Sequence, residues 1–382
     1  MSQSFLAGSF LKLATSGVQQ LTPYQPGKPV EELERELGIS QSGKSAIKLA
    51  SNENPLGPSP LAVEAITRLS SSVNYYPDGG GFALSNKLAQ TYQLDASNIT
   101  LGNGSNDILE LVTRAFLTPL HSAVFSAYSF AVYPIVVQAV GAKANVAKAF
   151  PEDHETMPLG HDPDALLSQI DDSTRIVFIA NPNNPTGTWL TPSALEELFD
   201  NIAENVIIVL DLAYTEYMDE EIKPPIKQWL EKFPNLVVTQ TFSKVYALAG
   251  LRIGYSMSNP EIADILNRVR QPFNTNMLAQ AAAIASLDDD EHVLNSVEMN
   301  NAGKLFLQNA FSEMNLNYLP TMGNFISVNV KQDGMLLYER LLQQGVIVRP
   351  VANYDMPEYL RITIGTQQQN ERFVVAFKRC LS

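Results

Sequence analysis

The middle of the chain alternates short apolar runs with longer amphipathic segments. Between about residues 101 and 257 the short runs are rich in β-branched residues, and the longer segments repeat their apolar positions with a helical period. The clearest runs predict strands at residues 176–180, 206–210 and 236–239. This alternation is typical of βα units and predicts an α/β fold with a mostly parallel sheet.

One amphipathic segment, which follows the loop GNGSND, predicts a helix in detail. Its apolar side chains fall on one stripe, formed by Ile108, Leu109, Leu111, Val112, Ala115 and Phe116. The helix begins in the loop GNGSND, where Ser105 or Asn106 is expected to cap it.

The pattern changes after about residue 280. Long polar helices follow, and then the segments FISVNV and YLRITIG, which favour antiparallel strands in a smaller α+β domain. We expect a large domain at residues 51–280, a small domain at 281–382 and an N-terminal segment, 1–50, that packs with the small domain. Because no repeat and no Gly- or Ser-rich linker separates these parts, they should pack closely.

Composition narrows the function classes. The 382 residues carry 26 basic and 40 acidic side chains, and the net charge of −14 argues against nucleic acid or an anionic membrane surface as a partner. There is no export signal and no apolar run long enough to cross a membrane, and Cys380, the one cysteine, cannot form an internal disulfide. The four histidines lack metal-ligand spacing. We therefore expect a cytoplasmic protein without a metal.

Each of the three predicted strands runs directly into a polar motif. The first leads into NPNNPTG at 181–187, the second into DLAY at 211–214 and the third into TFSK at 241–244. In open α/β sheets ligands bind beyond the carboxyl ends of the strands, so the three motifs should converge on one site. NPNNPTG alone could equally be a simple turn, because Pro and Asn dominate turns. Together the motifs suit an organic cofactor better than a hydrolytic triad.

These motifs resemble those of the fold-type-I aminotransferases that use pyridoxal 5'-phosphate (PLP). The resemblance covers nearly the whole chain and rests on the order NPTG, then Asp and Tyr three residues apart, then SK, then Arg252 eight residues after Lys244. It implies a large domain with a mostly parallel seven-stranded sheet, a smaller α+β domain, and PLP as the cofactor.

The resemblance also implies roles for the residues nearest the cofactor ring. Lys244 would form the Schiff base with PLP and later carry a proton as general acid and base. Asp211 would lie against the pyridine nitrogen and keep it protonated. Asn184 and Tyr214 would hydrogen-bond the phenolic oxygen, and Tyr128 would stack on the ring.

The remaining cofactor contacts implied by the resemblance concern the phosphate. A helix N-terminus and side-chain donors would hold it, namely Gly104, Ser105, Asn106, Thr241, Ser243 and Arg252. Tyr76, in NYYPDGG, matches a tyrosine that reaches the neighbouring subunit's cofactor phosphate, which implies a homodimer. The adjacent Tyr75 leaves this register open by one residue.

Within this superfamily the chain is most similar to the histidinol-phosphate aminotransferases. The outer motifs carry this likeness: LTPYQPGKP around Tyr24, SNENPLGPSP around Asn52, GVIVRPV with Arg349 and YLRITIGT with Arg361. In that family the tyrosine and the two arginines bind the substrate phosphate, and the last arginine also binds the carboxylate of the amino-acid partner. The implied reaction converts L-histidinol phosphate and 2-oxoglutarate into imidazole acetol phosphate and L-glutamate, in histidine biosynthesis.

Three alternatives share this scaffold. A phosphothreonine decarboxylase would release carbon dioxide, and an aromatic aminotransferase would accept phenylalanine without a phosphate group. A PLP-binding regulator of transcription would need a basic DNA-binding module, and no such module is left over in this acidic chain.

Overall fold

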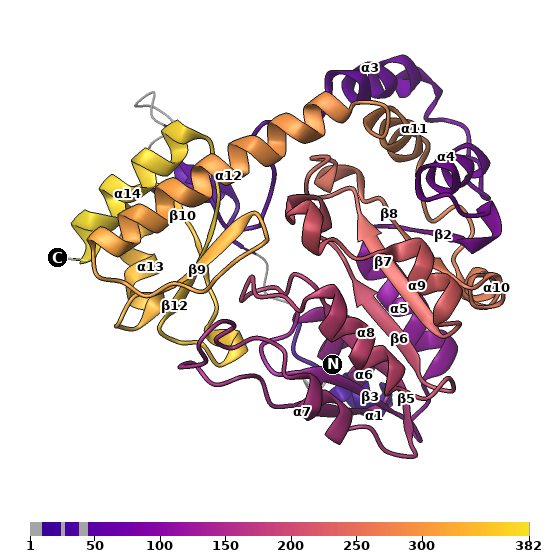
Figure 1. Ribbon diagram of the computed structural model, residues 1–382. Coiled ribbons are helices and arrows are strands. Elements are labelled where there is room, and N and C mark those ends of the chain that lie inside the picture. Colours follow the sequence, from indigo (N-terminus) through magenta and orange to yellow (C-terminus); the bar gives the residue numbers. More distant parts are fainter. Residues whose placement is uncertain (1–9, 24–26, 38–44, 382) are drawn as a thin grey trace, which may run out of the picture.

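The computed structural model describes residues 10–23, 27–37 and 45–381. Figure 1 shows two parts, with the long helix α12 (Asp290–Glu313) running from the larger part to the smaller one. At its first end α12 lies near α3 (Pro60–Leu69) and α11 (Met277–Ser286), which pack on each other. None of the helices in the described residues has both the length and the apolarity needed to cross a membrane.

The larger part is built on a seven-stranded sheet with the order β2-β8-β7-β6-β5-β3-β4. Its strands are β2 (Ile99–Gly102), β3 (Ser122–Ser126), β4 (Lys143–Ala147), β5 (Thr174–Ala180), β6 (Ile207–Asp211), β7 (Leu236–Thr241) and β8 (Gly254–Ser258). β8 runs in the direction opposite to the other six strands, so the prediction of a mostly parallel sheet is confirmed. The three strands predicted from apolar runs are β5, β6 and β7.

Helices cover both faces of this sheet, which explains why its central strands are apolar throughout. On β5, Ile176 and Phe178 pack with one set of helices, whereas Val177 and Ile179 pack with the other. The first set is α5 (Ser105–Phe116), α6 (Val132–Ala139) and α10 (Pro260–Val269). The second is α4 (Phe82–Tyr92), α7 (Pro163–Ser168), α8 (Pro192–Asp200) and α9 (Ile226–Lys232).

The smaller part contains a three-stranded antiparallel sheet in the order β11-β12-β9. Its strands are β9 (Phe325–Asn329), β11 (Arg349–Pro350) and β12 (Tyr359–Thr363), so FISVNV and YLRITIG form antiparallel strands as predicted. A separate parallel pair joins β1 (Ile47–Lys48) to β10 (Val346–Ile347). The helices α12, α13 (Gly334–Gln343) and α14 (Gln367–Leu381) close this core.

The N-terminal segment divides between the two parts. Helix α2 (Val30–Leu37) buries Leu33 against Ile347 of the smaller part, as expected. Helix α1 (Ser16–Gln19) instead packs beside α6, where a Cβ on Gly17 would lie 1.9 Å from the Gln138 carbonyl oxygen. We expected residues 1–50 to pack with the smaller part, and α1 differs from this expectation.

The predicted domain boundary at residue 280 falls inside α11. In this helix Ala279, Ala282 and Ala283 are buried in the same core as the large sheet. The change from one core to the other therefore occurs along α12, whose Leu307 and Phe311 belong to the core of the smaller part.

Candidate active site

A cavity of about 250 Å³ lies where β5, β6 and β7 end. Because these strands are parallel, their carboxyl ends meet at one edge of the sheet. Residues of the smaller part complete the wall. The predicted site residues that line the cavity are Asn52, Ser105, Asn106, Asn184, Asp211, Tyr214, Thr241, Ser243, Lys244, Arg252, Arg349 and Arg361.

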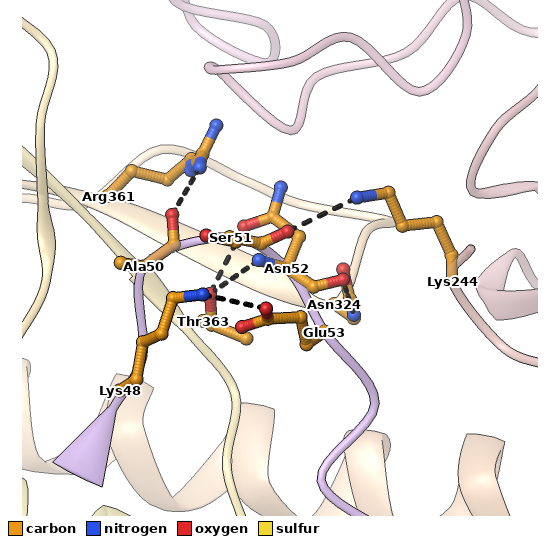
Figure 2. Close-up of polar contacts among 9 residues, drawn as sticks. All are labelled: Lys48, Ala50, Ser51, Asn52, Glu53, Lys244, Asn324, Arg361 and Thr363. Atoms are coloured by element: carbon orange, nitrogen blue, oxygen red, sulfur yellow. Dashed lines mark hydrogen bonds and ion pairs between the residues drawn. The ribbon is translucent and has the colours of Figure 1, made fainter. Parts of the chain in front are cut away.

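Lys244 follows β7 and extends its side chain across the cavity. Its Nζ donates a hydrogen bond to the Ser51 carbonyl oxygen at 3.2 Å (Figure 2). The same Nζ lies 5.5 Å from the ring centroid of Tyr214. An amine in such a cavity can act as a nucleophile and can carry a proton.

Asp211 is the last residue of β6 and is 5% exposed. Its Oδ1 accepts a hydrogen bond from the Ala213 amide at 3.2 Å, and its Oδ2 accepts one from the Tyr133 hydroxyl at 3.1 Å. Burial raises the pKa of the Asp211 carboxyl to about 6, although the hydrogen bonds from Tyr133 and Ala213 act in the opposite direction. A cationic ring nitrogen placed beside this carboxylate would offset the cost of burying its charge.

Tyr214 lines the cavity, and its hydroxyl group meets two asparagine side chains. Its oxygen accepts hydrogen bonds from Asn52 Nδ2 at 2.9 Å and from Asn184 Nδ2 at 3.3 Å. The Asn184 Oδ1 in turn accepts a hydrogen bond from Arg361 Nη1 at 2.5 Å, and Arg361 Nη2 donates to the Ala50 carbonyl at 2.7 Å (Figure 2).

One end of the cavity is suited to a phosphate. Ser105 and Asn106 belong to the first turn of α5, where the helix dipole favours an anion. Arg252 Nη1 donates to Ser243 Oγ at 3.4 Å, and Thr241 Oγ1 donates to the same oxygen at 3.0 Å. A guanidinium, two hydroxyls and a helix N-terminus therefore meet at this end.

Gly104 is required at this end of the cavity. It has φ of 81° and precedes α5 as its N-cap, so the predicted cap at Ser105 or Asn106 is wrong. A Cβ at position 104 would lie 2.4 Å from Arg252 Nη2. Only glycine leaves room for the guanidinium beside the helix N-terminus and accepts this backbone conformation.

The two predicted substrate arginines lie on one wall. Arg349 on β11 pairs directly with Arg361 on β12, and directly opposed residues of an antiparallel pair share one face. They are 9% and 6% exposed. Two guanidinium groups removed from water on one wall make a site for an anionic group such as a phosphate or a carboxylate.

Among the predicted contacts that the structure describes, Gly104, Tyr128 and Tyr76 do not line this cavity. Tyr128 lines a separate hollow with Ser126 and Tyr354, and Phe130 lines the cavity instead. Tyr76 is 81% exposed and stacks on Phe273 with a centroid distance of 4.7 Å. Tyr24 lies outside the described residues.

The sequence did not point to three residues that hydrogen-bond predicted ones, Ser51, Tyr133 and Thr363, or to Phe130, which lines the cavity. The aromatic cluster from Tyr128 to Tyr133 was the available signal for two of them, since it directly follows the end of β3. Tyr133 looks like an ordinary core aromatic in the sequence, and it does stack on Phe178 with a centroid distance of 4.8 Å. No group of three or more His, Cys, Asp or Glu side chains in the described part of the chain could hold a metal ion.

Comparisons with known proteins agree with this geometry. Residues 44–377 match the family Aminotransferase class I and II. Histidinol-phosphate aminotransferase 2 of Pseudomonas fluorescens is 52% identical over 377 residues, which cover 99% of this chain and 100% of that protein. Histidinol-phosphate aminotransferase 1 of Nitrosococcus oceani is 49% identical over 374 residues, which cover 97% of this chain and 98% of that protein.

A solved structure matches over nearly the same length. The crystal structure of histidinol-phosphate aminotransferase from Sinorhizobium meliloti in complex with pyridoxal-5'-phosphate has a TM-score of 0.86 and 26% sequence identity. The match covers 96% of this chain and 97% of that one. The chain belongs to the class I and II aminotransferase family.

Proposed function

We propose that the protein is a PLP-dependent histidinol-phosphate aminotransferase of histidine biosynthesis. It transfers the amino group of L-histidinol phosphate to 2-oxoglutarate, giving imidazole acetol phosphate and L-glutamate. The observation that carries the proposal is one cavity that holds Lys244, the buried Asp211 and two buried arginines. Relatives about half identical over nearly the whole chain are histidinol-phosphate aminotransferases.

The residues of the cavity fit PLP group by group. The end of the cavity with Arg252 would bind the cofactor phosphate. The Asp211 carboxylate would pair with a protonated ring nitrogen, and the Tyr214 hydroxyl would hydrogen-bond the phenolic oxygen. Phe130 lines this cavity and Tyr128 lines a separate hollow, so we propose Phe130 as the aromatic residue beside the cofactor ring. When bound, PLP supplies an aldehyde that bonds to an amine and a ring that withdraws electrons from that amine's α-carbon.

Lys244 has two tasks in this proposal. Its amino group would hold the cofactor covalently between turnovers, and after release it would take the proton from the substrate α-carbon and carry it to the carbon of the cofactor that had been bonded to the lysine. The Ser51 carbonyl, 3.2 Å from Nζ, provides an acceptor that holds the released amine at the cavity wall.

Arg349 and Arg361 bind the anionic end of each substrate. A guanidinium binds a phosphate or a carboxylate by donating two parallel hydrogen bonds, so one pocket serves both half-reactions. The two substrates then react in turn in a ping-pong cycle. Tyr24 is expected to join the arginines on the phosphate.

We also propose a cytoplasmic homodimer. The strongly exposed Tyr76 and its stacking partner Phe273 lie on the surface of a single chain, where a second copy would bury them. Tyr76 would then reach the cofactor phosphate of the other subunit. A reducing compartment suits a chain whose one cysteine, Cys380, is buried and free.

A two-step absorbance experiment tests the function. Adding L-histidinol phosphate alone to the yellow holoprotein should bleach its visible band, and adding 2-oxoglutarate should then restore the band. Lys244→Ala is the control and should not complete the cycle. Bleaching without recovery contradicts the acceptor. Carbon dioxide release would instead indicate a decarboxylase, and equal turnover of phenylalanine would indicate an aromatic aminotransferase.

A further inference from the structure

Two asparagine amides reach the hydroxyl oxygen of Tyr214. Asn52 Nδ2 lies 2.9 Å from this oxygen and Asn184 Nδ2 lies 3.3 Å from it. A phenolic oxygen has two acceptor lone pairs and one proton. Because both amides donate to this oxygen, the proton of the Tyr214 hydroxyl points away from them, toward another acceptor.

The direction of each amide determines this outcome, since an amide turned over would present its oxygen to Tyr214. The direction of the Asn184 amide is set by Arg361, whose guanidinium has donors only and therefore requires Oδ1 to face it. With Oδ1 on Arg361, the NH2 group of Asn184 faces the tyrosine.

The Asn52 amide is oriented by a different residue, Thr363. The Thr363 Oγ1 accepts a hydrogen bond from the Asn52 backbone amide at 2.9 Å and donates its proton to Asn52 Oδ1 at 3.2 Å (Figure 2). In the reversed orientation this proton would lose its acceptor, and the Asn52 oxygen would compete for the proton of Tyr214. Asn52 and Thr363 are 1% and 3% exposed, so water cannot readily replace the lost bond.

Both orienting residues come from one strand. Arg361 and Thr363 are alternate positions of β12, so their side chains lie on the same face of its sheet. The backbone of Asn52 is fixed as well, with φ of 56° and with its carbonyl oxygen accepting a hydrogen bond from Asn324 Nδ2 at 3.0 Å. Asn52 is thus held by hydrogen bonds to both its backbone and its side chain.

We infer that Thr363 and Asn52 are positioning residues: the Thr363 hydroxyl orients the Asn52 amide, and this amide makes Tyr214 a hydrogen-bond donor to the phenolic oxygen of the bound cofactor. The inference rests on the proposed function, because its target is PLP. A donor at that oxygen stabilises its anion and lowers the pKa at which the bound chromophore gains a proton. Asn52 then acts through Tyr214, in addition to any contact with the substrate.

A pH titration of the visible absorbance of the holoprotein, without substrate, tests this role. Thr363→Val keeps the shape of the side chain and removes its hydroxyl, so the pKa of the visible band should rise by about one unit, the scale of one hydrogen bond to a charged group. Thr363→Ser keeps the hydroxyl and should titrate like the wild type. In a Tyr214→Phe background, Thr363→Val should add no further shift.

A second variant covers the case in which Thr363→Val does not fold. Asn52→Gly tolerates the positive φ and keeps the backbone amide but removes the side-chain amide. It should raise the same pKa, and adding Thr363→Val to it should change nothing more. A Thr363→Val or Asn52→Gly holoprotein that titrates like the wild type overturns the inference, and so does a shift that persists in Tyr214→Phe. A wild-type protein without any visible band overturns the proposed function and this inference together.

Discussion

Replacing Tyr133 with phenylalanine tests how the buried carboxylate of Asp211 is held. The substitution removes the hydroxyl that donates to Asp211 Oδ2 at 3.1 Å and keeps the ring that stacks on Phe178. The change therefore isolates one hydrogen bond. It is best measured on the cofactor-free protein, where no ring nitrogen compensates the charge of Asp211.

The sign of the pH effect follows from the raised pKa of Asp211, which is about 6 in the folded protein against an ordinary value of 3.8. Between these two pH values the folded chain keeps a proton that the unfolded chain has lost, so the free energy of unfolding falls as pH rises through this window. The fall amounts to about 3 kcal/mol and ends near pH 6. Below about pH 4 the protonated Asp211 contributes its full stabilisation of the folded chain relative to neutral pH.

Tyr133→Phe should extend this fall to higher pH. A hydrogen bond to a charged group contributes roughly 1.5–3 kcal/mol, which corresponds to about one to two pKa units. The decline in stability should therefore end near pH 7 to 8, and the variant should be less stable than the wild type at pH 8 by about the same 1.5–3 kcal/mol.

Urea unfolding of the cofactor-free proteins at a series of pH values measures these free energies. Other carboxyl groups titrate in the same range, so the curve of each protein is compared with that of its Asp211→Asn counterpart, and the difference isolates Asp211. Tyr133→Phe should have no pH-dependent effect in the Asp211→Asn background. The difference in the free energy of unfolding could stop falling at the same pH for the wild type and for Tyr133→Phe. In that case Tyr133 does not hold the carboxylate as described.

Three further predictions concern the anion sites and the subunit contact. Arg349→Ala should lower kcat/KM for L-histidinol phosphate about 100-fold in steady-state kinetics, since a charged hydrogen-bonded pair contributes roughly 3 kcal/mol. It should lower kcat/KM for unphosphorylated histidinol much less. An equal loss for both amines contradicts a phosphate contact. Gly104→Ala places a Cβ 2.4 Å from Arg252 Nη2 at φ of 81°, so it should destabilise the protein by about 1–3 kcal/mol in thermal unfolding and weaken PLP binding. Gly250→Ala, where nothing lies within 4 Å of an added Cβ, is its control and should do neither. Tyr76→Phe should speed the loss of PLP on dialysis by about tenfold, the scale of one hydrogen bond to a phosphate, whereas Tyr75→Phe should not; the reverse pattern would move the contact by one residue.

The sequence predicted the elements that depend on local periodicity. The strands β5, β6 and β7 are buried apolar runs, and their parallel direction alone places the residues that follow them at one edge of the sheet. The helix α5 was also predicted, because its apolar stripe is long and regular. Its cap was not, since Gly104 is selected by the Arg252 side chain, which comes from a distant part of the sequence.

The remaining differences and omissions depend on tertiary contacts. Tyr128 and Phe130 differ by two positions, and the left-handed backbone of Tyr128, with φ of 57°, is not visible in the sequence. Tyr133 and Thr363 follow the pattern of a helix and a strand core, so their hydroxyls could not be separated from ordinary buried side chains. Only the fold shows that each one meets a predicted site residue.

The hydrogen bonds of Ala50 and Ser51 have a consequence for the size of substrate that the cavity accepts. The Ala50 carbonyl holds the guanidinium of Arg361, and the next carbonyl along the chain holds the ammonium of Lys244. Consecutive Cα atoms are about 3.8 Å apart in any protein. The covalent geometry of residues 50 and 51 therefore limits the distance between the Lys244 amine, which reacts, and the Arg361 guanidinium, which binds the far end of the ligand. A change in the core of either domain would have to distort this short stretch of backbone before the enzyme could favour a longer or a shorter amine.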